Sequence, residues 1–228
     1  MASSNNLSNI SPGDFILYNY FRSSASYRVR IALELKEIPY EYRPVHLIKE
    51  GGEQYKPEYE ALNPSREVPT LVHKGHVIAQ SLAILDYLDH VVPTPRLYPP
   101  NPVARALVIQ ACEIINSGAQ PPANLRVQKQ LVEKFGASDA QKDAWTKYWI
   151  AYGLETMEAF LKKHAGKFSF GDDVTASDLC VVPMMFTADR FKVSVEKFST
   201  LRRIDENCAK LEPFKKASPA RQPDFTKS

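Results

Sequence analysis

The chain has 228 residues, of which 44% are hydrophobic and 24% are charged, and its formal net charge is +3. This composition is that of an ordinary globular protein with room for one or two domains. So small a charge gives no basis for nucleic-acid binding, and the absence of an apolar run of about 18 residues predicts no membrane span.

Residues 1–13 are polar, with neither the apolar core of a secretion signal nor the arginines of a mitochondrial presequence. We expect a disordered tail there and a cytoplasmic protein. The three widely spaced cysteines, Cys112, Cys180 and Cys208, agree with a reducing compartment. We expect them to be buried as free thiols.

Residues 14–92 predict a small α/β domain. The aromatic segment FILYNYF, residues 15–21, predicts a buried strand. We expect the elements that follow to be a helix at 23–36, a strand at 40–47, a short helix at 54–62, a hairpin over 68–79 that turns at Lys74-Gly75, and a helix capped by Ser81. His73 and His76 flank the hairpin turn without a third ligand at metal-site spacing, so no metal site is expected.

The segment 23–36 fits two periods. Apolar residues alternate with polar ones from Tyr27 to Leu35, as in a strand. On a helical wheel the same residues form two apolar faces, as in a helix that is covered on two sides. The strong helix formers in the segment and the serine pair ahead of it favour the helix.

The second half of the chain follows a break in the pattern. Five prolines between 93 and 102 interrupt any regular element, and we place a linker at 93–100. After it the pattern is helical: an N-terminus at Asn101-Pro102, a helix at about 123–134, a capping box at Ser138–Gln141 that opens a long helix, a second capping box at Thr175–Asp178, and a last helix at 198–211. Asp178 is therefore expected to stabilise a helix start and not to catalyse.

An aromatic stripe marks the long helix. Its members recur at helical spacing: Trp145, Tyr148, Trp149 and Tyr152. Such a stripe is typical of a face that packs into the core.

Three short pieces of the first domain bear on chemistry, whereas phosphate-binding and hydrolase motifs are absent. Ser23 and Ser24 lie where a strand passes into a helix, and a helix N-terminus stabilises an anion. Val68-Pro69 precedes a strand, and a cis bond there would leave the Val68 backbone as an edge for an extended peptide.

The third piece is Gln80-Ser81, whose helix start can hold a carboxylate. Each piece also has an ordinary structural explanation, as a helix cap or a turn. Together they describe a site for a small acidic peptide.

The stretch SSASYRVRIAL, residues 23–33, resembles the signature Ser-Ser-Cys-x-x-Arg-Val-Arg-Ile-Ala-Leu of the zeta class of glutathione transferases, the maleylacetoacetate isomerase family. Further motifs resemble that family in order: ALNPSREVPTL, QSLAILDYLD, PTPRLYP, QPPANLRV, GDDVTASDL, ADRFKV and RQPD. The resemblance implies the glutathione transferase fold. This is a thioredoxin-like, glutathione-binding domain over 14–92 and an all-helical domain over 101–228 that carries the substrate site. It also implies a homodimer.

The resemblance implies glutathione-dependent cis–trans isomerisation of maleylacetoacetate to fumarylacetoacetate, in phenylalanine and tyrosine catabolism. The cofactor would be glutathione and the substrate a small dicarboxylate or keto-acid. By position, the resemblance assigns catalysis to Ser23, Ser24 and Arg190. It assigns glutathione binding to Ser23, Ser24, Ala25, Arg28, Gln54, Val68, Pro69, Gln80, Ser81, Gln120, Asn124, Leu125 and Arg126.

Two arginines each have more than one possible role. Arg190 would pair with a substrate carboxylate through its planar fork, or else form an ordinary ion pair at the surface or between domains. For Arg30 we expect exposure to solvent or an acidic neighbour.

The chain departs from the signature at Ala25, where the family has cysteine. A methyl group cannot donate a hydrogen bond, so thiol activation falls to Ser23. Two alternatives to an isomerase therefore stay open. One is a zeta-type transferase or dehalogenase that acts on small α-haloacids, and the other is a non-catalytic protein that binds glutathione.

Overall fold

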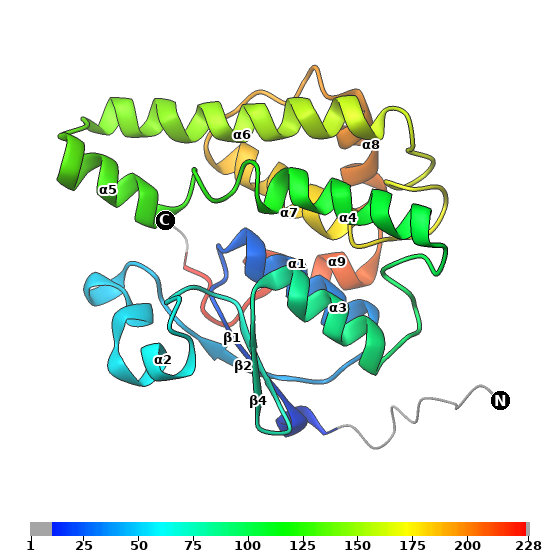
Figure 1. Cartoon of the computed structure of the whole chain (residues 1–228), viewed down its shortest axis with the longest axis horizontal. Coiled ribbons are helices and arrows are strands. Elements are labelled where there is room, and N and C mark those ends of the chain that lie inside the picture. The colour runs from blue at the N-terminus through cyan, green and yellow to red at the C-terminus, as the bar shows by residue number, and fades with distance from the viewer. Residues whose placement is uncertain (1–10, 227–228) are drawn as a thin grey trace. The chain divides into compact units, whose positions relative to one another are not determined.

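A computed structural model of the chain describes residues 11–226 (Figure 1). The predicted tail over 1–13 lies outside the described residues as far as residue 10, and a 3-10 turn, η2 (Pro12–Asp14), follows. The chain forms two compact units. One consists of the residues up to Leu97 together with those from Lys210 onward, and the other of Tyr98–Ala209.

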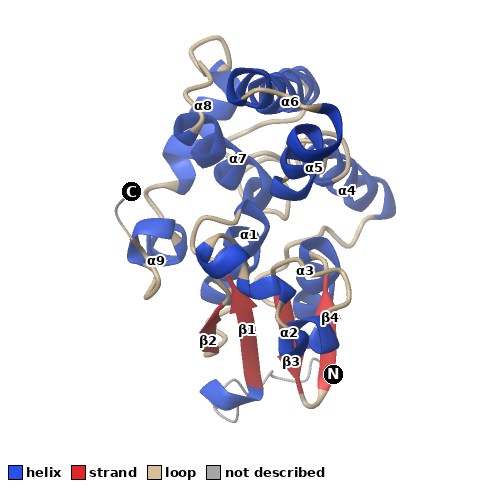
Figure 2. Ribbon diagram, turned by 90° about the vertical axis from the view of Figure 1, so that its left-hand side faces the viewer, coloured by secondary structure: helices blue, strands red, loops and turns tan. Residues whose placement is uncertain are grey.

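The first unit is built on a four-stranded sheet (Figure 2). Its strands are β1 (Phe15–Asn19), β2 (Glu41–Pro44), β3 (Thr70–His73) and β4 (His76–Ala79), in the order β2-β1-β3-β4. β1 runs parallel to β2 and antiparallel to β3, and β3 and β4 form a hairpin. The predicted turn is confirmed, since Lys74 and Gly75 have φ angles of 49° and 78°, as a two-residue hairpin loop requires.

Three α-helices alternate with these strands: α1 (Ser24–Leu35), α2 (Pro57–Leu62) and α3 (Ser81–Val91). α1 contacts both α3 and the C-terminal helix α9 (Glu212–Ala217). Val29, Ile31 and Leu33 are therefore fully buried, although they point to different sides of the helix. Burial on two sides explains why the sequence of α1 fits a strand period as well as a helix period, and the prediction of a helix is confirmed.

The second unit is helical. It contains α4 (Pro102–Asn116), α5 (Leu125–Phe135), α6 (Asp139–Leu161), α7 (Asp178–Arg190) and α8 (Ser199–Cys208). The predicted helix starts are confirmed at α4, where the Asn101 side chain accepts from two amides, and at α6, where Ser138 and Gln141 form the capping box. Within residues 11–226 no helix combines the length and apolar character that crossing a membrane requires.

The aromatic stripe of α6 does not face the core, so that prediction was wrong. Trp145, Tyr148 and Tyr152 are 37%, 60% and 46% exposed. The opposite face of the helix is buried instead, and a Cβ at Gly153 would lie 2.4 Å from the Cβ of Ala119. That close approach fixes which face of α6 packs inward.

The C-terminal residues group differently from the predicted helical domain 101–228. Residues from Lys210 onward belong to the first unit, because α9 packs on α1. The predicted last helix, 198–211, ends earlier, at Cys208, and α9 had not been predicted. Cys112, Cys180 and Cys208 are buried free thiols, as expected.

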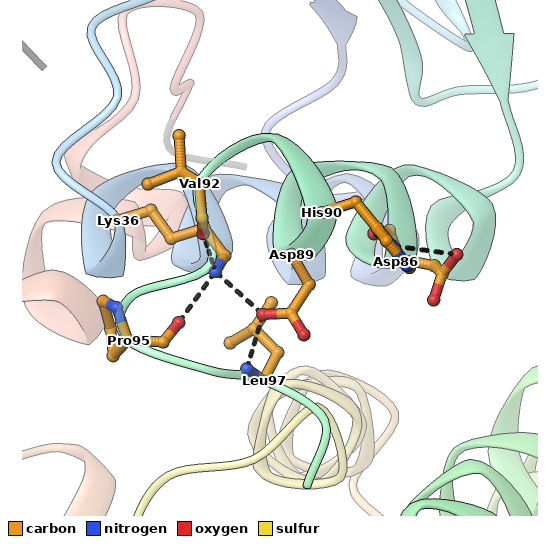
Figure 3. Close-up of polar contacts among 7 residues, drawn as sticks. All are labelled: Lys36, Asp86, Asp89, His90, Val92, Pro95 and Leu97. Atoms are coloured by element: carbon orange, nitrogen blue, oxygen red, sulfur yellow. Dashed lines mark hydrogen bonds and ion pairs between the residues drawn. The ribbon is translucent and has the colours of Figure 1, made fainter. Parts of the chain in front are cut away.

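A buried ion pair anchors the start of the predicted linker (Figure 3). Lys36 Nζ, at the end of α1, donates to Asp89 Oδ1 of α3 at 2.9 Å and to the carbonyls of Val92 and Pro95 at 2.7 Å each. Asp89 Oδ1 also accepts from the Leu97 amide at 2.7 Å. Burial lowers the pKa of Lys36, and the hydrogen bond to Asp89 opposes this shift.

Replacing Lys36 with methionine removes the ammonium and leaves the Asp89 carboxylate buried. We predict that Lys36→Met lowers the free energy of unfolding by about 3 kcal/mol. The control is Lys147→Met, which breaks an exposed ion pair with Asp143 and costs below about 1 kcal/mol. Urea unfolding followed by circular dichroism measures both, and equal losses would contradict the importance given to the buried pair.

Candidate functional site

Ser23 ends the turn between β1 and α1. Its amide donates to the Tyr20 carbonyl at 3.0 Å, and its Oγ accepts from the Ser26 amide at 3.2 Å as the N-cap of α1. Capping uses a lone pair of the hydroxyl oxygen and leaves the hydroxyl proton to be donated elsewhere. The capping explanation and the catalytic one are therefore compatible.

The first turn of α1 gives this position its electrostatic character. Ser24 and Ala25 open the helix and are half-buried. Their amides have no acceptor within the helix, and the helix dipole adds partial positive charge. An anion placed beside Ser23 is stabilised there.

Arg30 departs from its prediction, since its side chain is fully buried and contacts no solvent. Its guanidinium donates to Asn19 Oδ1 and the Phe21 carbonyl at 3.0 Å each, to the Tyr20 carbonyl at 3.3 Å, and to the Ala217 carbonyl at 3.0 Å. Burial lowers the pKa of Arg30, while Tyr42 and other nearby groups oppose the shift. The physical reason is that backbone carbonyls replace the expected carboxylate as partners.

Arg28 and Ser81 join α1 to α3. Arg28 is fully buried, and its Nη1 donates to Ser81 Oγ at 3.0 Å. The prediction of Ser81 as N-cap was wrong, because Ser81 is the first residue of α3 and Gln80 is the N-cap. The Ser81 hydroxyl is thus held by an arginine from a neighbouring helix.

Gln80 has an unusual backbone, with φ 69° and ψ 117°. This conformation strains any residue that carries a Cβ, and such strain concentrates at functional sites. Its side chain makes no capping hydrogen bond. The strain therefore has no evident local structural gain.

Val68 and Gln54 offer unused hydrogen-bonding groups. The Val68-Pro69 bond is cis, and among residues 11–226 the Val68 amide and carbonyl have no hydrogen-bond partner. Gln54 is 7% exposed and donates from Nε2 to the Leu47 carbonyl at 3.2 Å. Its buried Oε1 accepts from no described group. Such orphaned acceptors call for an explanation, and a peptide-like ligand supplies one.

The sheet brings three of these pieces to one edge. Tyr18 pairs with Thr70, and Thr70 pairs with Ala79, so the end of β1, the start of β3 and the end of β4 lie together. Ser23, Val68 and Gln80 follow or precede those strand ends by a few residues. Tyr20 and Val68 also share a buried apolar cluster.

The remaining predicted residues lie in the helical unit. Asn124 is the N-cap of α5, and its Oδ1 accepts from the Arg126 amide at 3.3 Å. Leu125 and Arg126 are exposed, and Gln120 is half-buried in the loop before them. Arg190 is exposed at the last position of α7, with its guanidinium 4.8 Å from the centre of the Phe191 ring.

Asp178 stabilises the start of α7, as predicted, but the N-cap of α7 is Ser177 and not Thr175, so the expected capping box is not the one that forms. Its carboxylate accepts from the amides of Ser169 and Thr175 at 2.8 Å each, and burial raises its pKa. In the described residues no group of three or more metal-ligating side chains is placed to hold an ion.

Comparison with known proteins assigns the first unit to a known family of domains. The family described as "Glutathione S-transferase, N-terminal domain" matches residues 22–91. The maleylacetoacetate isomerase of Mus musculus is 44% identical over 212 residues, which are 93% of this chain and 95% of the relative. The chain belongs to the maleylacetoacetate isomerase family of glutathione transferases.

Two solved structures extend the comparison. One is a maleylpyruvate isomerase described as a bacterial zeta-class glutathione transferase. It is 40% identical, covers 92% of this chain and 100% of its own, and has a TM-score of 0.88. The other is the maleylacetoacetate isomerase of Anaeromyxobacter dehalogenans with glutathione bound in its active site. It is 42% identical over 92% of this chain and 97% of its own, with a TM-score of 0.83. The predicted fold, thioredoxin-like and then helical, is confirmed.

The strain at Gln80 generates a test within this chain. Gln80→Gly relieves the backbone, whereas Gln80→Ala removes the same side chain and keeps the strain. We predict that the glycine variant is more stable than the alanine variant by about 1 kcal/mol in urea unfolding. Equal stabilities would show that the Gln80 backbone is unstrained in solution.

Proposed function

We propose that this chain catalyses the glutathione-dependent isomerisation of maleylacetoacetate to fumarylacetoacetate. The relatives at 40–44% identity carry maleylacetoacetate or maleylpyruvate isomerase names, which favour this activity over dehalogenation or binding alone. The observation that carries the proposal is the placement of Ser23. Its hydroxyl caps α1 at the sheet edge where Val68 and Gln80 also lie.

Glutathione, when bound, supplies a thiolate that adds reversibly to the cis double bond, so that the bond can rotate before the thiolate leaves. The chain's own task is to keep that thiol ionised and oriented. We assign the first part to Ser23 and to the amides of Ser24 and Ala25.

The expected shift in the pKa of the glutathione thiol is large enough to ionise much of it at pH 7. A free thiol with a pKa of about 8.5 is only about 3% ionised at pH 7. A hydrogen bond from Ser23 that is made only to the thiolate is worth roughly 1.5–3 kcal/mol and lowers that pKa by about 1–2 units. The positive end of α1 adds to this.

The unused polar groups of the first unit suit a tripeptide. The Val68 amide and carbonyl, before Pro69, would pair with its backbone, and the buried Gln54 Oε1 would accept one of its donors. Ser81 and the start of α3 would hold the γ-glutamyl carboxylate. Arg28 acts through Ser81, whose hydroxyl it orients.

The helical unit would supply the substrate side. We assign contacts with glutathione and substrate to Gln120, Asn124, Leu125 and Arg126, around the start of α5. Arg190, exposed at the end of α7, would pair with a carboxylate of the substrate.

We also propose a homodimeric, cytoplasmic protein. Two exposed apolar side chains on α4, Val103 and Ile109, support a partner surface. Three buried free thiols suit a reducing compartment. Sedimentation at micromolar concentration tests the dimer, and a monomer would contradict it.

The experiment follows isomerisation of maleylacetone, a stable analogue, with and without glutathione. Activity should require glutathione. We predict that Ser23→Ala loses roughly 10- to 25-fold in kcat/KM at pH 7, because without the donor the bound thiol returns to about 3% ionised. Ser23→Thr, which retains the hydroxyl and the cap, should keep most of the activity.

Ala25→Cys tests the departure from the family signature. Isomerisation by the protein with Ala25 shows that a cysteine is dispensable there. Activity that appears only in Ala25→Cys would contradict the proposal and favour a transferase or binding role. Unfolding curves of all variants separate loss of the cap from loss of chemistry, since a lost N-cap costs about 1 kcal/mol.

A further inference from the structure

The C-terminal segment reaches the turn that carries Ser23. Asp224 Oδ2 accepts from the Phe21 amide at 3.1 Å, across 203 positions of sequence. The Tyr42 hydroxyl makes a short contact with the other carboxylate oxygen. The Phe225 ring meets the Phe21 ring edge-on, with centroids 5.6 Å apart.

Phe21 is consequently held from both sides. Its amide bonds to Asp224, and its carbonyl accepts from Arg30 Nη2 at 3.0 Å. The preceding carbonyl, of Tyr20, accepts from both Arg30 and the Ser23 amide. Two opposite charges therefore fix the turn that ends at Ser23.

The segment that supplies Asp224 is itself well anchored. The Tyr27 hydroxyl of α1 donates to the Phe214 carbonyl at 3.3 Å, and Arg30 Nε donates to the Ala217 carbonyl. Beyond α9, Gln222 Nε2 donates to the carbonyls of Lys216 and Ser218 at 2.9 Å each. Because its own segment is fixed, the Asp224 carboxylate can hold the Phe21 amide in place.

We propose that Asp224 is a positioning residue for the Ser23 hydroxyl, acting through the Phe21 amide. This inference rests on the proposed function. A hydrogen bond to a carboxylate is stronger than one between neutral groups, and small displacements at a reacting centre cost much rate. Asp224, the last residue of the motif RQPD, thus supports the proposed glutathione site indirectly, through the turn before Ser23.

Three variants isolate the bond. Asp224→Ala removes both the charge and the acceptor. Asp224→Asn removes the charge but keeps an oxygen for the Phe21 amide. Tyr42→Phe removes the other contact of the same carboxylate and leaves the Phe21 bond in place.

The first readout needs no glutathione. Amide hydrogen exchange of the full-length protein should become faster in residues 21–26 of Asp224→Ala. It should rise less in Asp224→Asn, which keeps a weaker, neutral acceptor, and stay near the parent rate in Tyr42→Phe. The second readout is the ultraviolet absorbance of bound thiolate against pH. In Asp224→Ala the thiol pKa should rise by about one unit, which is about tenfold less thiolate below that pKa.

Several results would overturn the assignment. One is Asp224→Ala with lower stability but unchanged exchange and thiol pKa, which describes a purely structural anchor. Equal effects in Tyr42→Phe and Asp224→Ala would point to general loosening of the C-terminal segment. Failure of the parent protein to bind glutathione would refute the proposed function, while the exchange data would still decide whether Asp224 holds the turn.

Discussion

The guanidinium of Arg30 ties together three parts of the first unit: the end of β1, the turn after it, and α9. A buried charge is costly unless its hydrogen bonds are satisfied, and here three backbone carbonyls and the Asn19 side chain satisfy them. Two of those carbonyls, of Tyr20 and Phe21, belong to the turn that must be held still if the Ser23 hydroxyl is to face a ligand. Replacing Arg30 would therefore disturb fold and site at once.

Other groups at this edge of the sheet also combine a structural role with one toward a ligand. The Ser23 hydroxyl caps α1 with its oxygen and keeps its proton, and Ser81 is oriented by a buried arginine instead of capping its own helix. At Gln80 and Val68 the backbone retains strain or unpaired groups that an ordinary loop would avoid. A site that binds a peptide must leave such groups for its ligand, at some expense in stability.

Local patterns predicted most of the first unit, because apolar period, capping residues and the Lys74-Gly75 turn act over a few residues. Predictions from these local patterns failed where contacts with distant segments determine the environment of a residue. From local sequence Arg30 is expected at the surface, but α9 supplies one of its partners, 187 positions away in the sequence. Asp224 likewise bonds to the Phe21 amide, 203 positions away in the sequence. The spacing of the aromatic stripe around Trp145 predicts a face of α6 that packs into the core. The close approach at Gly153 shows that the opposite face packs inward. The roles proposed for Ser23 and Gln80 depend on resemblance to a family, since each residue also fits an ordinary cap or turn. The role proposed for Gln54 rests on that resemblance alone.

We propose that the turn held by Arg30 places Ser23 and the start of α1 where they stabilise a thiolate. The most direct test is the pKa of the glutathione thiol bound to the intact protein, from thiolate absorbance across pH. If Ser23 and α1 stabilise the thiolate, this pKa lies about 1–2 units below the value of about 8.5 for a free thiol. A bound thiol that titrates like the free one would contradict this proposal, whatever the isomerase activity.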